Sequence, residues 1–223
     1  NNIQIIISLK DLYDQLGASN YRDLYSYPLG NSNEEAALNA VRLFANHPAV
    51  WGFGISDEAP ESPAELGQWQ PILQGRYQKI KSLTSKPVME VLVGATSSSA
   101  GARRSFLSSL RSSTDTFALD YYPIPYQSQA LISDIGGDLR AVGDNNGWFV
   151  TQAFSWSSYP GTAANLGFSL ASARLPTSYE MVAMSALALN GGARNILFYS
   201  YFDIKNNPAQ LSALRQAITS LRN

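Results

Sequence analysis

Two adjacent carboxylates stand at the end of an apolar run in residues 50–62, VWGFGISDEAPES. Asp57 and Glu58 follow a stretch that resembles a buried strand, and such a pair can supply a proton donor beside an ionised carboxylate. Acids that stabilise a helix N-terminus lie in its first turn, and Glu61 and Glu65 already stand nearer the expected helix start. We therefore interpret Asp57 and Glu58 as candidate catalytic residues, with a pair of surface acids in a turn as the alternative.

A third acid ends a second apolar run, in the sequence TFALDYYPIP. Asp120 and Tyr122 share one face of the expected strand because side chains alternate along it, whereas Tyr121 is interpreted as ordinary packing. Asp120 is the third catalytic candidate, and Tyr122 is a candidate for binding a substrate. The alternative for Asp120 is a structural acid that is satisfied by hydrogen bonds.

Amide, aromatic and acidic side chains follow two further apolar runs. Gln152 and Trp156 lie in TQAFSW, and the run NILFYSYFD carries Tyr199, Tyr201 and Asp203. Aromatic rings pack against the C–H faces of sugars while polar groups bind the hydroxyls, so these residues are candidates for binding a carbohydrate. Taken singly, each aromatic is better explained as core or rim packing, and it is their convergence at strand ends that favours binding.

Two other titratable side chains are weaker candidates. Glu90 lies in the middle of an expected strand, on its polar face, and burial there would raise its pKa. The only histidine, His47, precedes an expected strand and is interpreted as structural, because one histidine cannot build a histidine-rich metal site. With no cysteine in the chain, thiolate nucleophiles and disulfides are excluded.

The elements that position these residues alternate along the chain. Hydrophobic periodicity predicts six strands, each followed by a helix. The strands are expected at 3–9, 50–56, 88–94, 116–122, 148–154 and 195–202, and the helices near 33–46, 63–84, 99–111, 127–142, 178–190 and 208–221. Capping boxes are expected at Ser62–Glu65 and Thr177–Glu180, a helix stop at residues 190–192 and a helix start at Asn207-Pro208. Strict alternation favours a parallel sheet with helical crossovers.

The two faces of the expected strands differ, which favours a barrel over an open sheet. An open sheet buries both faces under helices. Here one face carries residues such as Phe53 and Ile55, and the other carries small or polar residues such as Gly54 and Ser56. We predict one (β/α)8 TIM-barrel-type domain over residues 1–223. Six strands are too few, so either the first two βα units are absent or another segment replaces them.

Composition and charge exclude several classes of partner. The net charge of −1 gives no attraction to nucleic acid or to an anionic membrane. No apolar run is long enough to span a bilayer. No sequence motif calls for a metal, a flavin or a nucleotide, so no cofactor is expected. The compartment is left open, with a secreted or extracytoplasmic location favoured.

Several of these stretches resemble one known family. HPAVWGFGISDEAPE is similar to the fourth strand of glycoside-hydrolase-like TIM barrels of the clan A type, and TDTFALDYYPIP, WFVTQAFSW and MSALALNGGARNILFYSYFD resemble strands six to eight. The resemblance implies that the chain carries strands three to eight and that Glu58 is the general acid. It places Gln152 where the retaining enzymes have a nucleophilic carboxylate. Asp120 is then the first choice for the second carboxylate, followed by Asp203 or Asp57, and the mechanism would be inverting.

Three functions follow from this resemblance. The first is a glycosidase, an enzyme that cleaves a poly- or oligosaccharide. The second is a carbohydrate-binding barrel that has lost its nucleophile, which the amide of Gln152 favours. The third is a structural domain of a larger assembly. If the first strands are absent, an unpaired sheet edge would require pairing with another chain or segment.

Overall fold

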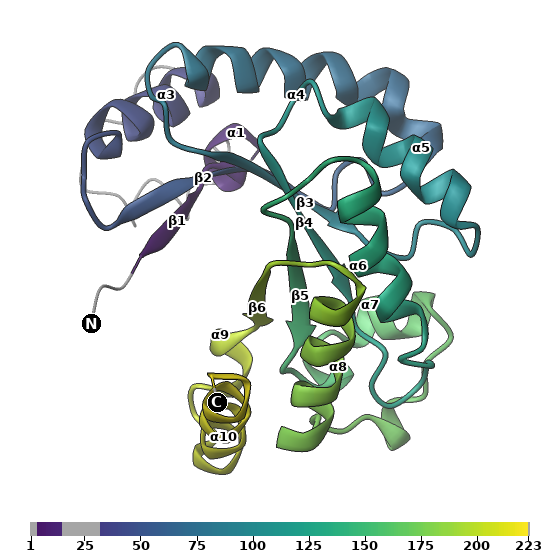
Figure 1. Cartoon of the computed structure of the whole chain (residues 1–223). Coiled ribbons are helices and arrows are strands. Elements are labelled where there is room, and N and C mark those ends of the chain that lie inside the picture. The colour runs from purple at the N-terminus through teal and green to yellow at the C-terminus, as the bar shows by residue number, and fades with distance from the viewer. Residues whose placement is uncertain (1–3, 15–31, 223) are drawn as a thin grey trace. The chain divides into compact units, whose positions relative to one another are not determined.

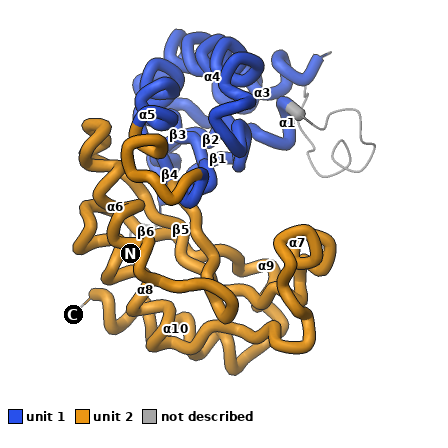
Figure 2. Tube along the Cα trace, turned by 90° about the vertical axis from the view of Figure 1, so that its right-hand side faces the viewer, with its two compact units in different colours: residues 1–96, 105–118 blue, residues 97–104, 119–223 orange. Residues whose placement is uncertain are grey.

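The computed structural model describes residues 4–14 and 32–222 (Figure 1), and the expected strand residue Ile3 lies outside them. The chain forms two compact units, which Figure 2 shows in different colours. Unit 1 comprises residues 1–96 and 105–118, and unit 2 comprises residues 97–104 and 119–223. The single barrel domain over residues 1–223 stays a prediction.

Six strands form one sheet, and their order in the sheet is their order along the chain. The register pairs β1 with β2, β2 with β3 and β5 with β6 in parallel. Helices connect successive strands, so the predicted α/β class is confirmed, and the sequential order is consistent with part of a TIM barrel. The strands are β1 (Ile5–Ser8), β2 (Val50–Asp57), β3 (Val88–Val93), β4 (Thr116–Tyr121), β5 (Trp148–Gln152) and β6 (Asn195–Tyr199).

The two end strands of this order are β1 and β6. The predicted strand over residues 195–202 is wrong at its end, because β6 stops at Tyr199. There the hydroxyl of Ser200 accepts a hydrogen bond from the backbone N–H of Asp203 and starts a short helix. The predicted pairing of a sheet edge with another chain or segment stays a prediction.

Six long helices overlap the six predicted helical ranges. They are α3 (Asn33–Phe44), α4 (Leu66–Lys81), α5 (Ala100–Leu110), α6 (Leu131–Ala141), α8 (Ser178–Gly191) and α10 (Pro208–Arg222). Among the described residues, three short helices were not predicted: α1 (Lys10–Asp14), α7 (Pro160–Asn165) and α9 (Tyr201–Ile204). Helices of one or two turns are too short to show a helical period in the sequence.

The predicted helix caps have different outcomes. The capping box of Thr177 and Glu180 at the start of α8 is confirmed, since the hydroxyl of Thr177 accepts from the N–H of Glu180 and the Glu180 carboxylate accepts from the N–H of Thr177. The capping box at Ser62 is wrong. A 3₁₀ turn over Pro63–Glu65 precedes α4, the Ser62 side chain makes no cap, and Glu65 accepts from the N–H of Glu61 instead. Pro63 favours this tight turn because its ring fixes φ.

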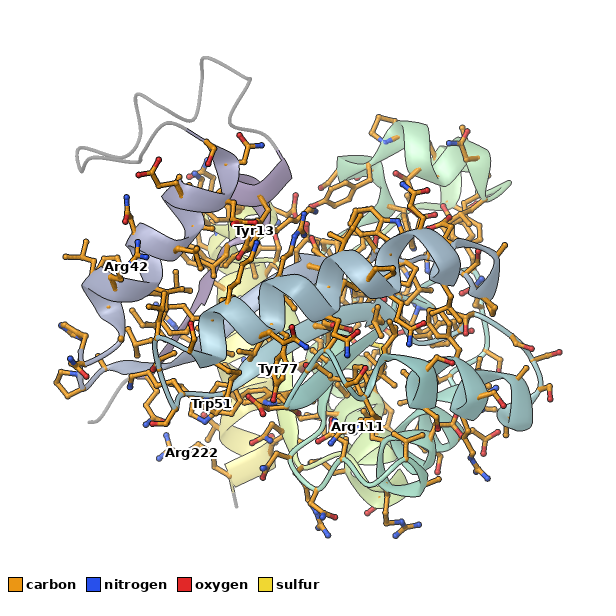
Figure 3. The ribbon with its side chains drawn as sticks, turned by 90° about the horizontal axis from the view of Figure 1, so that it is seen from above. Tyr13, Arg42, Trp51, Tyr77, Arg111 and Arg222 are labelled. Atoms are coloured by element: carbon orange, nitrogen blue, oxygen red, sulfur yellow. The ribbon has the colours of Figure 1, made fainter. Side chains whose placement is uncertain are left out.

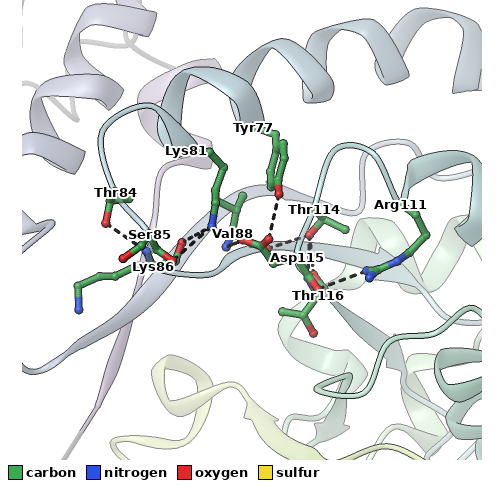
Figure 4. Close-up of polar contacts among 10 residues, drawn as sticks. All are labelled: Tyr77, Lys81, Thr84, Ser85, Lys86, Val88, Arg111, Thr114, Asp115 and Thr116. Atoms are coloured by element: carbon green, nitrogen blue, oxygen red, sulfur yellow. Dashed lines mark hydrogen bonds and ion pairs between the residues drawn. The ribbon is translucent and has the colours of Figure 1, made fainter.

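In unit 1, one carboxylate joins α4 to the amino ends of β3 and β4 (Figure 4). Asp115 accepts hydrogen bonds from the hydroxyl of Tyr77 at 2.9 Å, from Lys81 Nζ at 3.0 Å and from the N–H of Val88 at 2.8 Å. Its backbone carbonyl accepts from Arg111 at 3.3 Å. We call these five residues the Asp115 network. In a barrel-type sheet, polar groups at the amino ends of strands serve stability.

A stacked arginine connects α1, α4 and β2 in the same unit. The guanidinium of Arg76 lies 4.2 Å from the ring centroid of Tyr13 and 5.9 Å from that of Trp69, and it donates to the carbonyl of Ile55 at 3.1 Å. Tyr13 is labelled in Figure 3. Burial raises the pKa of the Tyr13 phenol to about 12, so this ring stays neutral at physiological pH.

In unit 2, two glycines allow α6 and α8 to pack closely. A Cβ on Gly191 would lie 2.1 Å from the carbonyl oxygen of Ser133, and one on Gly136 would lie 2.3 Å from that of Ala188. Both positions therefore require glycine, because the contacting atoms belong to backbone. A buried ion pair fixes the other side of α6, where Arg103 Nε donates to Asp138 at 2.6 Å.

Candidate functional site

The predicted catalytic pair lies at the carboxyl end of β2, in unit 1. Asp57 is the last residue of the strand, and its carboxylate accepts a hydrogen bond from Lys10 Nζ at 2.8 Å. Lys10 opens α1, directly after β1, so the ion pair joins the ends of two neighbouring parallel strands. Asp57 holds the pKa of Lys10 above its ordinary value, although the burial of the amine opposes this rise.

Glu58 has an unusual backbone conformation. Its φ is +53°, and among the described residues it is the one non-glycine residue with a positive φ. Its N–H donates to the carbonyl of Val91 at 2.9 Å, so the neighbouring strand holds the turn in place. The carboxylate of Glu58 is half-buried and, together with Asp57, adds to the negative charge beside Lys10. Strained backbone of this kind costs about 1–3 kcal/mol and often occurs at functional sites.

Glu90 is buried in β3, and burial raises the pKa of its carboxyl to about 8. The expected rise is thereby confirmed. The hydroxyl of Ser113 and the guanidinium of Arg111 oppose the rise, but Ser113 gives its proton to the carbonyl of Leu110 at 2.6 Å. In the described part of the chain, neither carboxyl oxygen of Glu90 has a hydrogen-bond partner. Glu90 is therefore protonated at neutral pH and is closed to a substrate.

The predicted aromatic residues of unit 2 gather in one cluster. The aromatic cluster consists of Tyr122, Phe154, Trp156, Tyr159 and Tyr199. Tyr122 stacks on Tyr199 with centroids 5.8 Å apart and an interplanar angle of 25°. Phe154 meets the other four rings edge to face, at centroid distances from 5.0 to 5.8 Å. Edge-to-face and offset contacts of this kind stabilise an aromatic group beyond the area that it buries.

Two carboxylates are bound to tyrosines of this cluster. The hydroxyl of Tyr122 donates to Asp120 at 3.2 Å, and the hydroxyl of Tyr159 donates to Asp203 at 2.9 Å. The hydroxyl of Ser200 also donates to Asp203, at 2.5 Å. Burial, followed by the hydrogen bonds to Tyr199 and Asp203, raises the pKa of Tyr159. Tyr159 therefore stays protonated, and the two tyrosines hold Asp120 on β4 and Asp203 on α9.

Two other predicted binding residues are occupied by structural contacts. Gln152 is fully buried, where its amide oxygen accepts from the N–H of Ile124 and its amide nitrogen donates to the carbonyls of Ile124 and Phe154. Trp156 is also buried, and its indole N–H donates to the carbonyl of Tyr122 at 3.3 Å. Both side chains therefore stabilise the aromatic cluster from its buried side. Their predicted contact with a substrate stays a prediction.

Of the predicted aromatic residues, Tyr199 is 40% exposed, and Tyr201, which follows the cluster on the chain without belonging to it, is 62% exposed. Two cluster members were not predicted as site residues, namely Phe154 and Tyr159. The signal for Tyr159 is its position three residues after Trp156 in the same loop, directly before Pro160. Asp57 and Glu58 belong to unit 1 and Asp120 belongs to unit 2, so the pairing of Glu58 with Asp120 stays a prediction.

Metal binding and membrane insertion find no support in the described residues. Within them, no group of three His, Cys, Asp or Glu side chains could hold a metal ion. No helix in the same ranges is long and apolar enough to cross a bilayer.

Comparison with known proteins identifies the fold. No family model matches the sequence, and no curated protein sequence matches it. Among solved structures, a protein provisionally assigned as an alpha-L-fucosidase from Bacteroides thetaiotaomicron VPI-5482 superposes on 83% of this chain with a TM-score of 0.57 at 9% identity. The fold is glycoside-hydrolase-like. A glucosidase from Croceicoccus marinus matches 81% of the chain with a TM-score of 0.49 at 11% identity.

The glycoside-hydrolase-like fold covers only part of these proteins. This chain spans 58% of the length of the fucosidase chain and 41% of the length of the glucosidase chain. At such low identity the likeness shows the fold and not the activity. The clan A strand numbering and the role of each site residue therefore stay predictions.

Proposed function

We propose that this protein binds a poly- or oligosaccharide on the aromatic cluster of unit 2 and hydrolyses it. The observation that carries the proposal is the combination of stacked rings with two tyrosine-bound carboxylates, one on β4 and one on α9. Rings offer apolar faces to the C–H side of a sugar, and carboxylates accept hydrogen bonds from its hydroxyls. Tyr199 and Tyr201 supply exposed ring surface, and Asp203 supplies the acceptor.

Each carboxylate has its own task in the proposed hydrolysis. Glu58 is proposed as the general acid that protonates the leaving oxygen, since it directly follows β2 at the carboxyl end, where a barrel-type sheet builds its active site. Asp120 is proposed as the base that activates water, with Tyr122 as its hydrogen-bond donor. The amide of Gln152 cannot act as a nucleophile, which favours an inverting displacement over a retaining one. Asp57 is proposed to contribute its negative charge to the site, where the ion pair with Lys10 holds its carboxylate in place.

The two parts of this proposal, saccharide binding and hydrolysis, are measured separately on the same proteins. Sugar release is measured on a panel of polysaccharides and oligosaccharides that includes a fucoside and a glucoside, for the wild type, Glu58→Gln and Glu61→Gln. Glu61 is an exposed acid three residues further on and serves as the matched control. We expect Glu58→Gln to abolish release without loss of saccharide binding, whereas Glu61→Gln keeps full activity. Equal activity of all three proteins would refute Glu58 as the acid.

A non-catalytic carbohydrate-binding protein is the second candidate. It is favoured by Gln152, which the sequence resemblance to clan A enzymes puts at the position of their nucleophile and whose amide makes three hydrogen bonds within the protein. Saturable binding without product from any substrate, equal for the wild type and Glu58→Gln, would establish this second function.

A further inference from the structure

Two exposed aromatic side chains lie next to the aromatic cluster, on α9. Tyr201 is 62% exposed and Phe202 is 79% exposed, although large apolar side chains in a monomeric protein usually find cover. Tyr199 precedes them at the end of β6 and is itself 40% exposed. We call Tyr199, Tyr201 and Phe202 the outer platform. Phe202 has no part in the site described above.

The outer platform is held in place by the turn beneath it. Ser200 caps α9 through Asp203, and the N–H of Lys205 donates to the carbonyl of Tyr201 at 2.8 Å. Ile204 is fully buried and anchors the helix. The rings are therefore displayed on fixed backbone, which lowers the entropy cost of binding a ligand.

Polar groups accompany the rings. Lys205 Nζ lies 5.2 Å from the ring centroid of Phe202, and Asp203 lies between the two on the chain. One positive and one negative group leave this surface close to neutral, with a donor and an acceptor beside the apolar faces. Such a surface suits a neutral sugar better than an acidic one.

The size of the outer platform argues against a second copy of this chain as its occupant. Fully buried aromatic side chains contribute about 150–250 Å² each, and these three are already partly covered. A stable protein interface needs about 800 Å² per partner. The platform is too small for that, but several stacked sugar units would fit its scale.

The outer platform shares a residue with the aromatic cluster, and this favours the same kind of ligand, a saccharide, on both. Tyr199 belongs to both surfaces, since it stacks on Tyr122, its hydroxyl lies 3.1 Å from that of Tyr159, and it is 40% exposed. We propose that the outer platform binds further units of a neutral saccharide chain whose first units occupy the aromatic cluster, with Phe202 as an unassigned stacking residue. This inference rests on the proposed carbohydrate function and narrows its ligand to chains rather than single sugars.

The test compares chain lengths in Phe202→Ala and in a matched control. Affinities are measured by calorimetry for neutral hexasaccharides (β-1,4-glucan, β-1,3-glucan and xylan fragments) and for glucose and xylose. Tyr179→Ala is the control, because Tyr179 is 80% exposed but lies on α8, away from the chain segment of the platform. We expect Phe202→Ala to weaken hexasaccharide binding about 3- to 10-fold, with monosaccharide binding unchanged. Tyr179→Ala should change neither.

Each contrary result has a distinct meaning. Hexasaccharide affinity that is equal in the wild type and Phe202→Ala overturns the outer platform and leaves the proposed function standing. No binding of any saccharide to the wild type overturns both. A concentration-dependent dimer in sedimentation that Phe202→Ala dissociates would make a second copy the occupant, and it would overturn this inference as well.

Discussion

The Asp115 network of unit 1 and the aromatic cluster of unit 2 use similar side chains in opposite ways. In the first, Lys81 Nζ donates to Asp115 and to the carbonyls of Ser85 and Lys86, so all three of its protons are used. In the second, the donors to Asp203 among the described residues lie on one of its two oxygens, and Tyr199 is 40% exposed. A network that satisfies itself stabilises the fold. A network that leaves acceptors and ring faces open has capacity for a ligand.

The largest expected effect is a pH dependence of the free energy of unfolding, caused by Glu90, which lies in unit 1 but outside the Asp115 network. Glu90 has no hydrogen-bond partner among the described residues, and its pKa of about 8 lies far above the ordinary 4.5. The folded protein then holds a proton that the unfolded chain releases, so the stability contributed by protonated Glu90 is complete below pH 4.5 and is lost as the pH rises through 8. Glu90→Gln should remove this loss, which we expect to be on the order of 4 kcal/mol. Urea unfolding at pH 5 and pH 9 measures it, and parallel pH profiles of the two proteins would contradict it.

The second effect breaks the Asp115 network. Asp115→Ala removes the acceptor of the Tyr77 hydroxyl and one of the three acceptors of Lys81, and it should lower the free energy of unfolding by about 3 kcal/mol. Saccharide affinity should stay unchanged, because the network belongs to unit 1. Asp134→Ala on the exposed side of α6 is the control and should change stability by less than about 0.5 kcal/mol. If Asp115→Ala weakens saccharide binding while the protein remains folded, the division between the two regions is wrong.

The third effect removes one hydroxyl from the aromatic cluster. Tyr159→Phe keeps the ring but removes the hydrogen-bond donor to Asp203 and the hydroxyl–hydroxyl contact with Tyr199. We expect a loss of about 1 kcal/mol in stability and a several-fold loss in saccharide affinity. Tyr179→Phe is the matched control, since its hydroxyl lies on an exposed residue of α8. A loss of stability with no loss of affinity would assign Tyr159 to the core alone.

The smallest effect comes from an exposed ion pair. Arg174 donates to Glu180 at 2.6 Å and holds the pKa of that carboxyl down at about 2. The stabilisation is present above pH 4.5 and disappears as the pH falls through 2. Because Arg174 is half exposed, Arg174→Gln should cost only about 0.5 kcal/mol at pH 7. Thermal unfolding at pH 7 and pH 2 measures it, and a loss above 2 kcal/mol would show that this pair resembles the Asp115 network.

Periodicity was sufficient to predict the six strands and six long helices, because apolar residues recur along them, even in β1 and β6, where no residue is fully buried. The end of β6 was not predictable in this way. YSYFD continues the aromatic pattern of the strand, and the cap formed by Ser200 and Asp203 competes with the sheet for the same backbone. Ser62 shows the converse, where a favourable cap sequence is overridden by the turn that Pro63 imposes.

The chemical character of the site was partly readable from sequence. Positions at strand ends placed Asp120, Tyr122 and Tyr199 correctly at the carboxyl ends of β4 and β6. Whether a side chain is exposed or engaged depends on tertiary contacts that no local pattern contains. The burial of Gln152 and Trp156 could therefore not be predicted. The positive φ of Glu58 could not be predicted either, because glutamate rarely adopts this conformation.

The close crossing of α6 and α8 limits how this chain can diverge. At Gly136 and Gly191 a methyl group would have to displace backbone. Such positions tolerate no gradual exchange of side chains, so a second change elsewhere on the helices would have to come first. In a random mutant library of this protein, substitutions at these two glycines would therefore give unfolded proteins far more often than substitutions at the exposed rings of α9.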